Sequence, residues 1–112
     1  TTRSKPELCR ATDRNPGLLS RQGIPCAICT DYNVMPIALL PICAGMAVRE
    51  GMDYQQALAA ITINAASIVG IEDRVGSLAV GKDADFSVFD CDPLTLAAKP
   101  KMVVISGKVV AE

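Results

Sequence analysis

The sequence predicts an α/β fold whose character changes near residue 70. Its first part contains a short apolar run, residues 24–30, followed by two helical stretches, and a strand followed by helices is typical of an α/β unit. Its second part contains only short strand-like runs separated by glycine turns. Half of the 112 residues are apolar, which is enough to build a core.

The apolar run 24–30 predicts a strand, because it is too short for a helix and lies between chain breakers. Pro25 can occupy only the first position of such a strand. We expect the strand to be buried on both faces, as parallel strands are. A short helix that contains Leu18 and Leu19 and is closed by Gly23 is expected before it.

The first helical stretch begins at Pro36 or Pro41 and runs to about Glu50. Proline is tolerated in a first helical turn, where its missing N–H has no helical partner. Gly51 is expected to close this helix.

The second helical stretch runs from Asp53 to Gly70. Asp53 is expected to cap it, with Gln56 three residues later as in a capping box. Apolar residues recur along it at helical spacing, namely Ala57, Leu58, Ile61, Ala65 and Ile68. The same stretch contains Asn64, which we interpret as a buried amide that binds backbone.

After Gly70 we expect four short strands, at residues 75–78, 84–90, 103–105 and 108–110. Turns are expected at 80–82 and at 106–107, the second as a two-residue hairpin loop. The boundary near 70–74 predicts two parts, residues 1–72 and 73–112.

Charge and cysteine content exclude several classes of protein. The net charge of −1 gives no long-range field for nucleic acid or an anionic membrane. No apolar run reaches the roughly 18 residues that a membrane span needs. An odd number of cysteines argues against a complete disulfide framework and predicts a reducing, cytoplasmic location; they are Cys9, Cys26, Cys29, Cys43 and Cys91.

Asp31 is the main candidate for chemistry. It follows the predicted strand directly, and α/β folds and barrels place catalytic groups at the carboxyl ends of their strands. A carboxylate there can bind a metal or accept a proton from an attacking water. The alternative is that Asp31 only caps the following helix or turn.

Cys26 and Cys29 form a C-x-x-C pair, which is compatible with a redox pair or with half of a zinc site. On a strand, however, residues three apart point to opposite faces, so the two sulfurs should diverge. We therefore expect buried structural cysteines. The Lys82–Asp85 region, with Asp83 and Asp85, is interpreted as a solvated turn rather than a calcium site.

Several segments resemble those of one enzyme family. They are Cys29-Thr30-Asp31, then residues 39–52, 57–66, 70–78, 81–85, Asp92-Pro93 and 105–108, of which 76–85 is the most specific. On these residues the chain resembles the C-terminal portion of a metal-dependent amidohydrolase, of the imidazolonepropionase-like and prolidase-like branch.

The resemblance implies a (β/α)₈ TIM-type barrel with a small β-sandwich. Residues 1–72 would then hold the last barrel strand and its helices, and 73–112 the last strands of the sandwich. By resemblance, Asp31 would bind Zn²⁺ or another divalent metal in the intact parent and act as the base toward the attacking hydroxide. The parent would hydrolyse a C–N bond of a small-molecule cyclic amide, amidine or peptide-like substrate. Tyr32 stands where a histidine often follows this aspartate.

The chain contains no histidine, although the family binds its metal largely through histidines. We therefore expect these residues alone to be inactive and to hold no cofactor. The alternative is a non-catalytic structural or self-associating module, because a lone barrel unit leaves its sheet edge and apolar helix faces uncovered. Its partner would be a second copy or the missing barrel portion.

Overall fold

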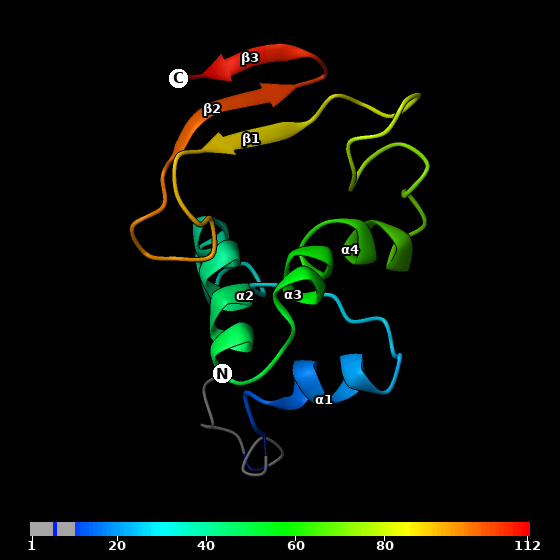
Figure 1. Cartoon of the computed structure of the whole chain (residues 1–112), viewed down its shortest axis with the longest axis vertical. Helices are drawn as coiled ribbons and strands as arrows, with labels where there is room; N and C mark the ends of the chain where they lie inside the picture. Colours follow the sequence, from blue (N-terminus) through cyan, green and yellow to red (C-terminus); the bar gives the residue numbers. More distant parts are fainter. Residues whose placement is uncertain (1–5, 7–10) are drawn as a thin grey trace.

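The computed structural model describes residue 6 and residues 11–112. These described residues form four α-helices, one 3₁₀ helix and three strands: α1 (Asn15–Arg21), η2 (Ile37–Leu39), α2 (Leu40–Arg49), α3 (Tyr54–Ala60), α4 (Ile63–Ile68), β1 (Phe86–Phe89), β2 (Pro100–Ile105) and β3 (Lys108–Ala111). They are stacked along the long axis of the molecule, with α1 at one end, α2 to α4 in the middle and the sheet at the other end (Figure 1).

The helices begin and end largely where prolines and glycines predicted. Pro41 lies in the first turn of α2, which follows η2. Gly51 follows α2 with a φ of 99°, and Gly23 follows α1 with a φ of 74°. These are left-handed conformations that glycine adopts without a steric cost.

The second helical stretch is two helices instead of the predicted one. Asp53 caps α3 as expected, because its side chain accepts a hydrogen bond from the Gln56 N–H at 3.1 Å. The helix then breaks at residues 61–62, where the Thr62 hydroxyl donates to the Leu58 carbonyl at 2.7 Å. Such a hydroxyl competes with the backbone hydrogen bonds of the helix. The adjacent β-branched residues lower the helix propensity further. Gly70 follows α4, with a φ of 74°.

The core lies between α2 and α3 and is built mainly from small side chains. Its buried residues are Ala44, Ala47, Met52, Ala57, Ala60 and Leu94. The alanines let the two helices approach closely, since they contribute almost no side-chain thickness. Leu94 is distant in sequence from the other core residues, because it lies in the loop between β1 and β2.

The sheet is antiparallel with the order β1-β2-β3. The β2–β3 hairpin turns through Ser106 and Gly107, whose φ values are 50° and 75°, as a type I′ turn requires. The Asp85 carboxylate accepts from the Ser106 N–H at 2.7 Å and so holds this turn beside the start of β1.

Residues 75–78 form no strand, and the prediction for them was wrong. They belong to an irregular connection in which Gly76, at a φ of 89°, lies against Ala66 and Ile63 of α4. A side chain at residue 76 would collide with them. The connection is closed by an exposed ion pair of 2.8 Å between Arg74 and Asp83. Packing against α4 therefore overrides the strand propensity of these residues.

Residues 24–30 are extended but do not form a strand. A strand requires a hydrogen-bonded neighbour, and the described part of the chain places none beside them. Their backbone instead bonds to helices: the Ile24 N–H donates to the Leu19 carbonyl at 3.1 Å, and the Ile28 N–H to the Ala60 carbonyl at 3.0 Å. The N–H groups of Ala27 and Cys29 have no partner among the described residues.

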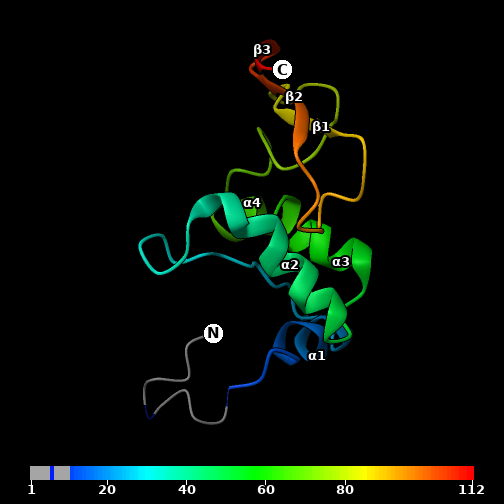
Figure 2. The same cartoon turned by 90° about the vertical axis from the view of Figure 1, so that its left-hand side faces the viewer.

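The molecule is less compact than its size allows. Its accessible surface is 7999 Å², whereas a folded monomer of this mass typically exposes about 5,900 Å². Its dimensions are 45 × 29 × 25 Å, and Figure 2 shows the sheet standing away from the helices. Within the described ranges, no helix is long and apolar enough to cross a membrane.

Candidate functional site

The extended segment 24–30 has two different faces. Alternate side chains turn toward the helices and away from them, as in a strand. The inward set is half-buried or buried, and it consists of Cys26, Ile28 and Thr30. The outward set is exposed, and it consists of Ala27 and Cys29. The segment is therefore not buried on both faces as predicted, and Asp31, which follows it directly, is exposed.

The helices fix the position of this segment. Ile28 packs against the helical core, and its N–H is bonded to the end of α3 through Ala60. The Asn64 side chain of α4 donates to the Cys26 carbonyl at 3.4 Å. Asn64 binds backbone as its interpretation from the sequence required, but it is half-buried where a buried amide was expected. Because Asp31 follows this segment directly, these contacts also position Asp31.

Asp31 begins a tight turn of unusual backbone geometry. Its φ is 51° and that of Asn33 is 42°, and the Val34 N–H donates to the Asp31 carbonyl at 2.8 Å. Aspartate and asparagine tolerate this left-handed region better than other residues with side chains. Between them the Tyr32 side chain is 77% exposed. Apart from the presence of these two residue types, nothing in the sequence predicts this geometry.

The Asp31 carboxylate has no hydrogen-bond or ion-pair partner in the part of the chain that the structure describes. The alternative role, a side-chain cap for the following turn or helix, is therefore not what the structure shows. An exposed, unpaired carboxylate at a fixed position is free to bind a ligand or to accept a proton.

The residues that the structure describes do not make a metal centre. The chain has no histidine, and the described residues contain no group of three histidine, cysteine, aspartate or glutamate side chains that could hold an ion. Asp31 alone supplies fewer ligands than the three or four of a zinc site.

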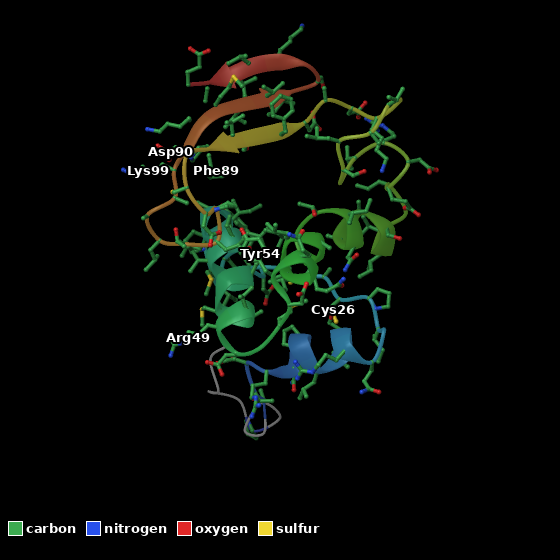
Figure 3. The ribbon with its side chains drawn as sticks, viewed as in Figure 1. Cys26, Arg49, Tyr54, Phe89, Asp90 and Lys99 are labelled. Carbon is green, nitrogen blue, oxygen red and sulfur yellow. The ribbon has the colours of Figure 1, made fainter. Side chains whose placement is uncertain are left out.

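The cysteines do not form a redox or zinc pair in the described residues. Cys26, labelled in Figure 3, is half-buried, and its thiol lies 3.4 Å from the Ile24 carbonyl. Cys29 is exposed. The expected divergence of the two sulfurs agrees with the different exposure of the two cysteines. The expectation that both are buried was wrong, because Cys26 is half-buried and Cys29 is exposed. Cys43 and Cys91 are also free thiols, and Cys9 lies outside the described residues.

Asp31 lines neither of two hollows in the described surface. One, of about 370 Å³, is bordered by α1, α3 and residues 23–25. The other is a groove of about 820 Å³ between α3, α4 and β1, and its lining is largely apolar. The groove separates the sheet from the helices.

A polar contact that the sequence did not predict joins the sheet region to α3. The Tyr54 hydroxyl donates to the Asp92 carboxylate at 2.8 Å. This hydrogen bond, together with desolvation and the nearby negative charge, raises the pKa of Tyr54 above its ordinary value. The two residues are 38 positions apart, and no sequence spacing connects them.

The chain matches known proteins along almost all of its length. A family model described as "Amidohydrolase family" matches residues 4–110. The imidazolonepropionases of Shewanella oneidensis and Shewanella baltica are each 38% identical to it over 114 residues, which is 90% of this chain and 27% of theirs. A crystal structure of an amidohydrolase from Thermotoga maritima MSB8 superposes with a TM-score of 0.93 at 34% identity, and covers 98% of this chain and 29% of that one.

The chain belongs to the amidohydrolase family. This agrees with the resemblance found in its sequence. It spans less than a third of the length of the imidazolonepropionases and of the solved amidohydrolase that it matches.

Proposed function

We propose that these residues are part of a hydrolase that acts on C–N bonds of small cyclic amides, amidines or peptide-like substrates. The single observation that carries the proposal is Asp31, an unpaired and exposed carboxylate held at the end of an extended segment in an amidohydrolase chain. The imidazolonepropionase name of the relatives makes imidazolonepropionate the first substrate to test.

The proposed role of Asp31 is proton transfer. A water attacks the carbonyl or amidine carbon, Asp31 takes the proton of that water, and the same carboxyl returns it to the leaving nitrogen. The C–O bond forms and the C–N bond breaks, so the reaction needs no further reactant. General acid–base groups of this kind typically contribute 10²- to 10⁴-fold to a rate.

Amidohydrolases are generally metal-dependent, but this chain has no histidine and its described residues do not fit a metal centre on their own. A centre of zinc or another divalent ion in a complete enzyme would need its other ligands from residues outside this sequence. No step above is assigned to it.

We further propose that residues 1–72 end a TIM-type barrel, with 24–30 as its last strand, and that 73–112 belong to a small β-sandwich. The unpaired N–H groups of Ala27 and Cys29 support this, because they are placed to bond a neighbouring strand. The large exposed surface and the share of the relatives that the chain spans support it as well.

The test replaces Asp31 by asparagine in the complete polypeptide that carries these residues, with Asp73→Asn as the matched control. Asp73 is likewise exposed but lies in the connection before β1. We expect Asp31→Asn to lower kcat for imidazolonepropionate or another cyclic amide by about 10²- to 10⁴-fold, and Asp73→Asn to leave it unchanged. Equal activity of the two variants would remove the assigned role of Asp31.

A second measurement tests the expected inactivity of the 112-residue chain alone. Hydrolysis of a hydantoin, dihydroorotate or an acyl-amino acid by this chain with added Zn²⁺ would contradict it.

The alternative function is a non-catalytic, self-associating module. One observation favours it, namely that apolar side chains and unpaired backbone groups are exposed on the same molecule; the most exposed include Val80, Leu96, Leu78 and Ile37.

A further inference from the structure

The loop between β1 and β2, residues 90–99, leaves the sheet and lies against the helices. In Figure 1 it descends from the end of β1 beside α2 and then returns to β2. Figure 3 shows Asp90 and Lys99 where the loop leaves and rejoins the sheet, and Tyr54 on the helical side. We call residues 90–99 the clasp.

Leu94 is the apolar end of the clasp. It is 7% exposed and belongs to the core formed by α2 and α3. Its carbonyl oxygen lies where a Cβ at Gly45 of α2 would stand, so that this approach requires glycine at residue 45. Leu96, two residues later, is 84% exposed. The clasp therefore inserts one particular leucine into the helical core.

Asp92 is the polar end of the clasp. One of its carboxylate oxygens accepts both the Tyr54 hydroxyl at 2.8 Å and the Leu94 N–H at 2.9 Å. The Asp92 carbonyl also accepts from the Thr95 hydroxyl at 2.9 Å, and the Ala98 N–H donates to the Thr95 carbonyl at 3.2 Å. The internal bonds shape the loop, and the Tyr54 bond ties that shape to α3.

The sheet has little other support from the helices. The apolar groove of about 820 Å³ separates β1 from α3 and α4, and no strand packs extensively on any described helix. Apart from the clasp, the sheet is joined to α4 through the irregular connection 69–85. A sheet held by one connection can pivot about it, whereas a second attachment restricts that motion.

We propose that the clasp is a built-in strap that sets the position of the three-stranded sheet against α2 and α3. Leu94 seated against Gly45 and the Tyr54–Asp92 hydrogen bond are its two closing contacts. Because α3 also binds the extended segment through Ala60, the strap and Asp31 are attached to one helix. The inference is independent of the hydrolase assignment.

The test is amide hydrogen exchange of the complete chain, read at Thr95 and Ala98, whose N–H groups bond within the clasp. Leu94→Ala removes the apolar contact, and Leu96→Ala is its matched control in the same loop. We expect Leu94→Ala to speed exchange at these amides by about tenfold or more, with a smaller effect on α2 and α3, and Leu96→Ala to change it less than about twofold.

Tyr54→Phe provides a second variant that keeps the ring and removes only the hydroxyl, with Tyr32→Phe as its control. We expect Tyr54→Phe to speed exchange in the clasp several-fold, and Tyr32→Phe to leave it unchanged. Clasp exchange that is equal in Tyr54→Phe and Tyr32→Phe, together with a uniform rise over all elements in Leu94→Ala, would overturn the strap.

Discussion

Tyr54 is the described residue whose proton equilibrium responds most clearly to the fold. Its hydroxyl is bonded to Asp92, and the bond raises the pKa of Tyr54. The protonated form is the one that the folded chain stabilises, so this contribution is fully present below the ordinary tyrosine pKa of about 10. It is lost as the pH rises through the higher pKa of the folded state, where the phenolate and Asp92 repel each other.

We therefore expect the clasp to loosen at alkaline pH. Hydrogen exchange at Thr95, corrected for the intrinsic effect of hydroxide, should accelerate above about pH 10 in the wild type. Tyr54→Phe should show faster exchange at neutral pH and lose this additional alkaline step. If the variant shows the same acceleration at alkaline pH, the acceleration arises from a titrating group other than Tyr54.

Single residues differed in how far the sequence could place them. Asp31 could be predicted because it follows an apolar run and matches a family segment, although its catalytic role stays a prediction. Its φ of 51° and its lack of a partner could not be predicted, because both depend on how the following turn and the helices fold. The Tyr54–Asp92 hydrogen bond could not be predicted for the same reason, since it forms only when the clasp lies against α3.

Among the elements, α3 joins the helix cap, the clasp and the extended segment 24–30. Its N-cap is Asp53, its first residue is Tyr54, and its last residue, Ala60, holds the extended segment. A side chain that satisfies the free N–H groups of a helix start typically stabilises a protein by about 1 kcal/mol. The stability of the start of α3 therefore also affects the clasp and the extended segment 24–30, which α3 binds.

We expect Asp53→Ala to lower the free energy of unfolding by about 1 kcal/mol, because the Gln56 N–H loses its acceptor. Asp73→Ala, at an exposed residue outside the helices, is the control and should change it by less than about 0.5 kcal/mol. Urea denaturation of the complete chain measures both. A control as destabilised as the cap variant would show that the loss is not due to capping.

Elements were predictable where local chemistry determines them. Prolines, glycines and the Asp53 cap located α1, α2 and the start of α3, and the Ser106–Gly107 turn located a hairpin. Prediction failed where neighbours decide: 24–30 is extended without a partner, 75–78 is bent by packing on α4, and Thr62 divides one expected helix into two.

The feature of the whole molecule with the widest consequences is its large exposed surface. The surface of 7999 Å² is about a third larger than is typical for this mass. Unpaired N–H groups at Ala27 and Cys29 add a site where another strand can pair. Such a surface favours association with whatever can cover it.

We expect the 112-residue chain alone to self-associate at micromolar concentration, with a state that depends on concentration in analytical ultracentrifugation. Ala27→Pro removes one unpaired N–H and should weaken the association, whereas Ala27→Ser keeps the N–H and should not. A dilute, stable monomer for the unmodified chain would contradict the self-associating alternative.

The seating of Leu94 also bears on the order in which the chain folds. The β2–β3 hairpin closes over two residues and α2 lies next to α3 in sequence, so both can form within microseconds from local contacts. The clasp contact joins Tyr54 and Asp92 across 38 residues, which makes its loop closure more costly in entropy. The helices and the sheet should therefore fold as separate units first, and their docking through Leu94 should be a late step.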